Sequence, residues 1–253
     1  MVILKSPEEI RKLRGNNLIV AQILEALKKI IRPGVTTFEL DRYCEELTLQ
    51  KGAKPAFKGY RGYPFSLCTS VNEEVVHGMP SDRKLREGDI VSLDFGIYHQ
   101  GLYGDAAVTV PVGEVSDEAG RLMRVTEEAL YKAIEQTRAG NRLGDISAAI
   151  QNHVEAAGYS VVRDLVGHGI GRSLHEDPQV PNYGREGRGI ELRPGIVLAI
   201  EPMVNAGTYA VKVLQDGWTV VTADGKLSAH FEHSVAITEN GPFILSRIDG
   251  KPD

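Results

Sequence analysis

Two ten-residue stretches of the chain, LREGDIVSLD at residues 85–94 and LRPGIVLAIE at residues 192–201, align without a gap. Leu, Arg and Gly are identical in the two stretches, and both end on an acidic residue, Asp94 in the first and Glu201 in the second. A second pair follows them, DAAVTV from Asp105 and EHSVAI from Glu232. Self-similarity of this kind is the sequence signature of a repeated structural unit. The sequence therefore predicts two copies of one unit.

Helix signals come before each of the repeated stretches, so both halves predict the same order of elements. Residues 6–9 (SPEE) form a capping box with proline at the first helical position, and apolar residues at spacings of three and four follow to residue 31. Thr37 is predicted to cap a second helix that ends at Gly52. A third helix is predicted to start at Ser116 and a fourth near Asp145. Strand-rich sequence follows each pair of helices.

The fold class follows from this repeated order of two helices and a set of strands. We expect an α/β (α+β) protein with a single domain, residues 1–253, whose halves span about residues 1–112 and 113–253. Duplicated units usually pack about a pseudo-twofold axis. Residues at equivalent positions of the two halves should then meet near that axis.

Composition and charge argue against several classes of function. The chain has 253 residues, 42% of them hydrophobic and 25% charged, and its net charge of −5 comes without a block of Lys or Arg that could bind nucleic acid or an anionic membrane. Its first residues include no apolar segment of signal-peptide length, which predicts a soluble, cytoplasmic protein. Cys44 and Cys68 form no C-x-x-C pair, so a metal site would have to use histidine and carboxylate.

The acidic residues of the repeats lie in strongly apolar strands. Any one of them alone could be a strand-end carboxylate that faces water. Four at repeat-equivalent positions would instead be buried, which is costly unless the charge is compensated. These strands carry no Lys or Arg, which favours metal binding over ion pairing. Two divalent ions would account for four carboxylates, and an oxygen-rich site with one imidazole suits Mn, Fe, Co or Zn.

Three histidines are candidate site residues. Residues 166–177 (VGHGIGRSLHED) place His168 and His175 seven apart, but the glycines between them and the proline that follows favour loop or strand over a helix. The segment also lacks the G-x-G-x-x-G spacing of a phosphate loop. His77 lies before the first repeated stretch much as His168 lies before the second. The repeat therefore makes both histidines candidate site residues.

The other histidines are predicted to be structural. His99, His153 and His230 lie near turns, where a hydrogen-bonded structural role is the ordinary one. His233 directly follows Glu232 on a predicted strand, so its side chain should point to the opposite face of the sheet and should not be a ligand.

These motifs resemble those of the type I methionine aminopeptidases, which have the pita-bread fold. The match covers nearly the whole chain and is carried by LDFGIYHQGLYGDAAVT (residues 93–109), GHGIGRSLHEDP (167–178), AIEPM (199–203) and HFEHSVAI (230–237). The resemblance implies two antiparallel sheet-and-helix halves around two divalent ions, which could be Co, Mn, Fe, Zn or Ni. By similarity, Asp94 would chelate one ion, and Asp105 and Glu232 would bridge both. His168 and Glu201 would hold the second ion.

The resemblance also implies residues that bind and process the substrate. His77 and His175 would contact the substrate, and Glu201 would carry protons for an attacking water that bridges the ions. The methionine pocket would consist of Phe57, Tyr60, Tyr63, Cys68, Leu174 and Trp218. Phe57 and Leu174 depart from the commonest bacterial form, which has cysteine and phenylalanine at these positions.

The implied activity is removal of the N-terminal methionine of newly made proteins when the second residue is small. The partners would be polypeptide N-termini, with the ribosome as a candidate place of action, and the enzyme would be a monomer without a membrane or nucleic-acid partner. Proline-specific peptidases and creatinase-like hydrolases are alternatives with the same fold, but they normally carry a large extra domain before the catalytic half, whereas here the first helix begins at Pro7.

Two further alternatives are less compatible with the residues. Type II methionine aminopeptidases carry a helical insertion for which there is no room between Glu201 and Glu232. A non-catalytic binding protein built on this fold should have lost metal ligands, and all five are present here.

Overall fold

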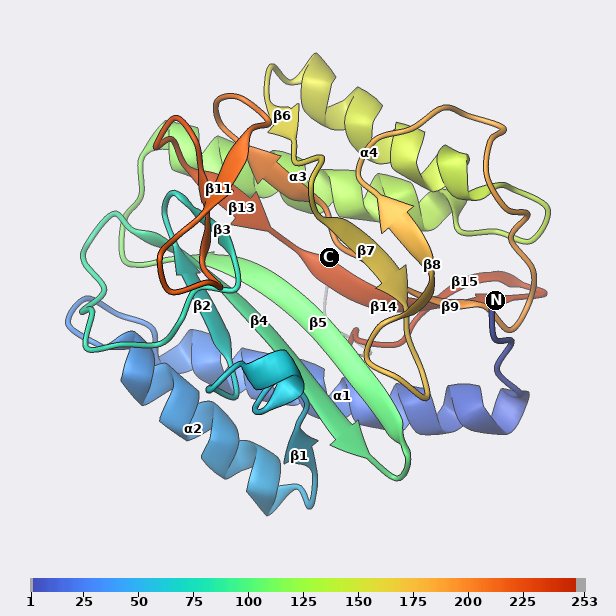
Figure 1. The fold of residues 1–253 in the computed structure, drawn as a ribbon, viewed down its shortest axis with the longest axis horizontal. Coiled ribbons are helices and arrows are strands. Elements are labelled where there is room, and N and C mark those ends of the chain that lie inside the picture. Colours follow the sequence, from blue (N-terminus) through green and yellow to red (C-terminus); the bar gives the residue numbers. More distant parts are fainter. Residues whose placement is uncertain (1, 249–253) are drawn as a thin grey trace.

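The predicted helices form in two consecutive pairs. In the computed structural model, which describes residues 2–248, α1 (Pro7–Ile30) and α2 (Thr37–Gln50) precede the first set of strands. The second pair, α3 (Asp117–Gln136) and α4 (Leu143–Ala156), precedes the second set. The two ends of the predicted domain fall outside the described residues. In the view of Figure 1, α1 and α2 lie below the long central strands and α3 and α4 lie above them.

The first two helices both begin with a capping box. The Ser6 hydroxyl accepts a hydrogen bond from Glu9 N (3.2 Å), and the Glu9 carboxylate accepts one from Ser6 N (2.9 Å), as predicted. The prediction that Thr37 caps α2 is wrong, because Thr36 occupies that position and forms the reciprocal pair with Glu39. Only Thr36 has a glutamate three residues later, since the same position counted from Thr37 is leucine.

The second helix pair starts close to the predicted positions. Ser116 caps α3 by accepting a hydrogen bond from Ala119 N (3.2 Å). The α4 helix begins at Leu143, and Asp145 lies in its first turn, where its carboxylate accepts a hydrogen bond from Arg142 N (2.7 Å). An acidic group in the first turn also interacts favourably with the positive end of the helix dipole.

The strands form one large sheet and two small ones. The large sheet has nine strands, with the order β1-β4-β5-β14-β9-β7-β8, and with β2 and β15 paired to β4 and β14. Its members are β1 (Lys54–Pro55), β2 (Cys68–Val71), β4 (Ile90–His99), β5 (Leu102–Pro111), β7 (Val166–Gly169), β8 (Glu176–Pro181), β9 (Val197–Ile200), β14 (Glu232–Thr238) and β15 (Gly241–Ile244).

The two small sheets have three strands each and flank the large one. One has the order β13-β10-β6 and the other β11-β12-β3. Their strands are β3 (Glu74–Val76), β6 (Ser160–Val161), β10 (Met203–Asn205), β11 (Val211–Val213), β12 (Val220–Thr222) and β13 (Ser228–His230). A short 3-10 turn, η1 (Tyr60–Gly62), lies between β1 and β2. All the pairings in these sheets are antiparallel.

The two repeated stretches are anchored in the same way. In the first half Gly34 N donates a hydrogen bond to Leu85 O (2.8 Å), and in the second half Gly140 N donates one to Leu192 O (3.0 Å). These bonds tie the turn after the first helix of each pair to the start of the repeated stretch, five residues before β4 and before β9. The equivalence read from the sequence thus appears again in the backbone contacts.

The two halves meet at the centre of the large sheet. There β5 pairs with β14, with Glu232 opposite Ala107 and His233 opposite Ala106. Each of these strands also pairs with the preceding repeat strand of its own half, β5 with β4 and β14 with β9. The four acidic positions of the repeats are thereby carried on, or directly next to, four adjacent strands.

Helices cover one face of these central strands. Ala106 on β5 packs in one hydrophobic cluster with Val20 and Leu24 of α1, and Val235 on β14 packs in another with Leu130 of α3. Because side chains alternate along a strand, Asp105 and Glu232 point to the other face. The fold therefore places the acidic residues opposite the two long helices. Among the described residues, no helix is both long and apolar enough to cross a membrane.

Candidate active site

All of the residues predicted to bind metal or substrate line one cavity of about 160 Å³. The five predicted ligands come from different elements: Asp94 from β4, Asp105 from β5, His168 from β7, Glu232 from β14, and Glu201 from the residue after β9. The remaining lining residues are Phe57, Tyr60, Arg61, Tyr63, Cys68, His77, Leu174, His175 and Trp218.

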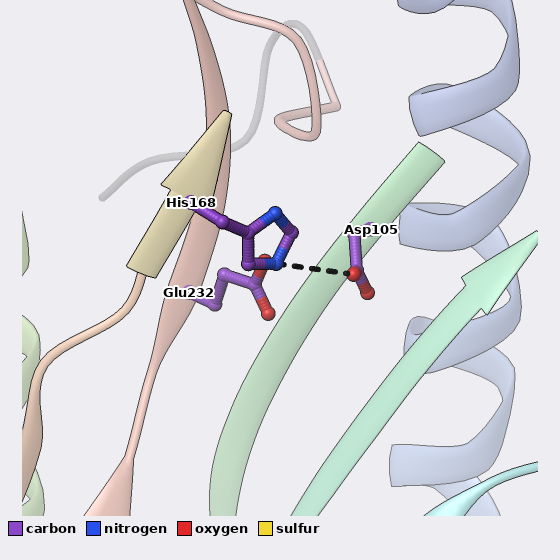
Figure 2. A group of neighbouring side chains, drawn as sticks. All are labelled: Asp105, His168 and Glu232. Carbon is purple, nitrogen blue, oxygen red and sulfur yellow. Dashed lines mark ion pairs between the residues drawn. The ribbon is translucent and has the colours of Figure 1, made fainter. Parts of the chain in front are cut away.

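Three of the predicted ligands converge closely. One donor atom each from Asp105, His168 and Glu232 lies within 4.8 Å of the other two, and Figure 2 shows these side chains reaching toward a common space from three strands. His168 Nε2 is 4.0 Å from Asp105 Oδ2 and 3.6 Å from Glu201 Oε1. These side chains are buried, Asp105 and Glu232 each being 3% exposed. The spacing leaves room for a cation between the donors.

The hydrogen bonding of this cluster fits a metal ion. Asp105 Oδ1 and Glu232 Oε1 are inaccessible to solvent and have no hydrogen-bond partner. Buried carboxylate oxygens without a partner are costly, and a coordinated cation removes that cost. His168 Nδ1 lies 2.9 Å from Gly169 O, which is the contact of an Nδ1–H donor. That tautomer leaves the lone pair of Nε2 facing the carboxylates, as a metal ligand requires.

The carboxyl groups of the cluster have raised pKa values. Burial, with the negative charge of Glu201, raises the pKa of Asp94 to about 7, and burial raises that of Glu201 to about 7. Burial and the neighbouring carboxylates also raise the pKa values of Asp105 and Glu232 well above their ordinary range. Without a cation the site therefore retains protons near neutral pH, and a bound divalent ion would displace them.

Stability of the metal-free protein should consequently fall as pH rises from 5.5 to 8. A carboxyl group whose pKa is higher in the folded than in the unfolded chain stabilises the fold below its unfolded pKa, and this contribution is lost as pH rises through about 7. Stabilisation by Mn²⁺ should grow over the same window, to about 5–10 °C in melting temperature at a metal concentration about 100 times the Kd. Thermal melts with EDTA or MnCl₂ measure this, and an equal metal-induced shift at every pH would contradict it.

The apolar side of the cavity consists of aromatic and sulfur-containing residues. The Tyr63 and Trp218 rings meet edge to face with their centroids 5.1 Å apart. Cys68 lies opposite Asp94 in the β2–β4 pairing, which places a buried thiol next to the acidic cluster. Tyr63 and Cys68 are buried, whereas Trp218 is half-buried. The cavity thus combines a charged floor with an apolar wall.

His175 lies at the rim of the cavity, partly open to solvent. Its Nδ1 is 2.8 Å from the Tyr60 hydroxyl, and its ring centroid is 4.3 Å from that of His168. Desolvation by the surrounding side chains, with the charges of His168 and Arg61, lowers the pKa of His175 to about 3. The imidazole is therefore neutral at physiological pH and is oriented by Tyr60.

His77 also lines the cavity, next to Trp218. Its backbone has φ 59°, a left-handed conformation that is uncommon for residues other than glycine and typical of functional sites. Pairing of Val76 with Val220 brings the Trp218 segment beside it, with the His77 and Trp218 rings 6.5 Å apart. Burial lowers the pKa of His77 to about 4, so this imidazole is neutral as well.

The structure corrects one prediction about the histidines. His230 is not a hydrogen-bonded structural residue, because neither ring nitrogen has a partner and its Nε2 lies 3.4 Å from Glu201 Oε2. Strand alternation could not supply this position, because His230 ends β13 in a small sheet and Glu232 begins β14 in the large sheet. Sequence reasoning also missed Arg61, an exposed residue at the cavity that lies 5.4 Å over the Tyr60 ring.

The other histidines lie as predicted. His99 Nδ1 is 3.1 Å from Gly52 O, and His153 Nε2 is 2.9 Å from Glu128, both in ordinary structural contacts. His233 points away from the cluster and contacts Ser246, with its Nδ1 2.8 Å from the hydroxyl oxygen.

Comparisons with known proteins match nearly the whole chain to one protein family. Residues 11–239 match the model of metallopeptidase family M24. The methionine aminopeptidase of Clostridium perfringens is 58% identical over 98% of this chain and all of its own length, and methionine aminopeptidase 1 of Bacillus subtilis is 54% identical with the same coverage.

Solved structures agree with these relatives. The crystal structure of the methionine aminopeptidase from Thermotoga maritima has a TM-score of 0.96 at 53% identity and covers 98% of this chain and all of that one. The prolidase from Pyrococcus horikoshii has a TM-score of 0.79 at 25% identity, and only 65% of its chain is covered. Both the acidic cluster and these likenesses lead to one assignment. The chain belongs to metallopeptidase family M24, in its methionine aminopeptidase branch, and has the pita-bread fold of that family.

Proposed function

We propose that the cavity over the central strands removes the N-terminal methionine of newly made polypeptides whose second residue is small. Membership in the methionine aminopeptidases establishes the aminopeptidase reaction and the use of divalent metal. The observation that carries the assignment of this cavity is the buried cluster of Asp105, His168 and Glu232, with its unpartnered carboxylate oxygens, at the floor of a pocket with aromatic walls.

The five predicted ligands would hold two divalent ions. Asp94 would chelate one ion, Asp105 and Glu232 would bridge both, and His168 and Glu201 would hold the other. Four carboxylates and one imidazole form a hard donor set that accepts Mn, Fe, Co, Zn or Ni, so availability would determine which ion is used. When bound, the ions would supply an activated water and polarise the scissile carbonyl.

The apolar wall would bind the methionine side chain. Tyr63, Trp218 and Cys68 offer a surface suited to an unbranched thioether, and contacts between sulfur and aromatic rings contribute roughly 0.3–1.5 kcal/mol each. Because one such contact discriminates weakly, the shape of the cavity must provide most of the selectivity, with Phe57 and Leu174 completing the wall. The free amine of the substrate would face the carboxylates, which restricts cleavage to the end of a chain.

The chain's own acid–base groups suit hydrolysis near neutral pH. Glu201, which lines the cavity beside His168, would accept a proton from the attacking water and return it to the leaving amine. His175 and His77 are neutral and can donate hydrogen bonds to the oxygen on which charge develops. The Tyr60 hydroxyl is hydrogen-bonded to Nδ1 of His175 and so fixes the orientation of that ring.

A peptide series separates the parts of this proposal. Met-Ala-Ser should be cleaved, whereas Leu-Ala-Ser and N-acetylated Met-Ala-Ser should react at least about 100-fold more slowly, because the pocket and the acidic floor reject them. In Met-X-Ser peptides the rate should fall as X grows from Gly to Leu. Chromatography of released methionine measures this. Comparable cleavage of the leucine or acetylated peptide would contradict the substrate assignment, and rapid cleavage with X = Leu would contradict only the small-residue rule.

The remaining features of the proposal concern the setting of the reaction. We propose one domain of two halves, residues 1–112 and 113–253, that acts as a monomer on nascent N-termini in the cytoplasm and without nucleic acid as a partner. A control peptide with an X-Pro bond tests the alternative activity of the proline-specific peptidases, which the partial coverage of the prolidase chain does not favour.

A further inference from the structure

His230 is a buried residue for which the proposed function has no role. It is the last residue of β13, it is 1% exposed, and both of its ring nitrogens are inaccessible to solvent and without a hydrogen-bond partner. Buried polar atoms in native proteins nearly always have a partner, so an exception calls for an explanation. A leucine at this position would fill similar space without that cost.

The position of His230 relative to Glu201 provides the explanation. His230 Nε2 lies 3.4 Å from Glu201 Oε2, whereas Glu201 Oε1 lies 3.6 Å from His168 Nε2. The two oxygens of one carboxylate therefore face two different imidazoles. One oxygen is directed to the acidic cluster, and the other is directed to His230.

The nearest ion-pair partner of His230 is Glu201, and the carboxyl group of Asp94 also lies close enough to influence the imidazole. When Glu201 ligates metal it must be ionised and can only accept hydrogen bonds, so the nitrogen that faces it must then carry the proton. This argument assigns the Nε2–H tautomer to His230.

The backbone of His230 is fixed by its neighbours. The Thr109 hydroxyl accepts a hydrogen bond from His230 N (2.9 Å) and donates one to His230 O (2.7 Å). Thr109 lies on β5, the strand that carries Asp105, and His230 also pairs with Met203 on β10, two residues after Glu201. The imidazole is thus held relative to both sides of the cluster.

We propose that His230 is a positioning residue for Glu201: Nε2, 3.4 Å from Oε2 and without a hydrogen bond here, would donate to Oε2 when Glu201 ligates metal, so that Oε1 is held toward the metal cluster. The inference rests on the proposed role of Glu201 as a ligand. Groups that orient a ligating carboxylate typically contribute 10–100-fold to metal affinity. The polar nitrogens of His230 would then be retained for metal binding at the expense of stability in the metal-free protein.

Two variants with opposite hydrogen-bonding capacity test the proposal. His230→Leu should weaken Mn²⁺ binding to the metal-free protein by about 10–100-fold in titration calorimetry, and lower kcat more than it raises KM. Its metal-free melting temperature should be equal to or above that of the wild type, because two unsatisfied nitrogens are removed. His230→Gln, whose amide can donate to Glu201, should recover most of the affinity. His153→Leu is the matched control, because His153 pairs with Glu128 at the surface. It should change neither the Mn²⁺ affinity nor the metal-free melting temperature.

A merely structural role predicts the reverse pattern, a lower metal-free melting temperature with unchanged Mn²⁺ affinity, and that result would overturn the proposal. Wild-type affinity in His230→Leu, or no recovery in His230→Gln, would do the same. Nitrogen NMR of the wild-type imidazole provides a test that needs no variant, because an Nδ1–H tautomer of His230 contradicts the assigned donor. Failure of the wild type to bind Mn²⁺ or to cleave Met-Ala-Ser would instead overturn the proposed function.

Discussion

Asp105→Asn is expected to abolish divalent-metal binding and peptidase activity together. The Asp105 carboxylate would bridge both ions, and the amide that replaces it has neither the charge nor the second equivalent oxygen that bridging requires. Mn²⁺ affinity should fall by more than the roughly 10–100-fold that outer residues of a metal site contribute. Calorimetric titration of the metal-free protein, together with methionine release from Met-Ala-Ser, measures both losses.

Loss of fold can be separated from loss of the site in this variant. Burial and nearby carboxylates raise the pKa of Asp105, so its ionisation destabilises the metal-free protein at alkaline pH. The metal-free Asp105→Asn variant should therefore melt at a higher temperature than the metal-free wild type at pH 8. Asp41→Asn is the matched control, because Asp41 is equally buried but accepts hydrogen bonds from Ser66 N and Leu67 N outside the cluster. Full-affinity metal binding by Asp105→Asn would contradict the two-ion site.

His175→Ala is expected to retain metal and lose at least about 100-fold in kcat, because it removes a donor aimed at charge that develops in the transition state. His77→Ala should behave in the same way. His168→Ala should instead lose metal, since its Nε2 faces the carboxylates of Asp105 and Glu201. Metal content by mass spectrometry, measured beside steady-state kinetics, distinguishes the two classes of histidine.

Tyr60→Phe is a graded control for the His175 variant. It removes the 2.8 Å contact to His175 Nδ1 but leaves the imidazole in place, so the loss in kcat should be smaller than in His175→Ala. Metal loss in His175→Ala, or metal retention in His168→Ala, would reverse the roles assigned to the two residues. The His168 and His175 rings are in contact with each other. A difference in metal content between the two variants would therefore reflect the different partners of the two imidazoles and not a difference in their distance from the site.

The helices and the acidic cluster could be predicted because their signals are local or repeated. A capping box occupies four consecutive residues, so the box at Ser6 can be identified from the sequence alone. The acidic residues stand out because each has a counterpart in the other half and none has a basic residue in its strand. The same rules, applied with more care, select Thr36 over Thr37.

Alternation along a strand fixes a face of the sheet, but it does not tell which side chains from other strands share that face. The sequence by itself determined the duplication, the two helix pairs, the carboxylates on the apolar repeat strands and the outward direction of His233, because each depends on periodicity or on residue type within a short segment. Only the tertiary structure decided that α1 and α3 cover the face opposite the cluster, that Arg61 reaches the cavity, and that the two oxygens of Glu201 face His168 and His230. These facts depend on contacts between segments far apart in the chain, whose free energies are set by packing and desolvation in the assembled fold and leave no periodic pattern in any one segment.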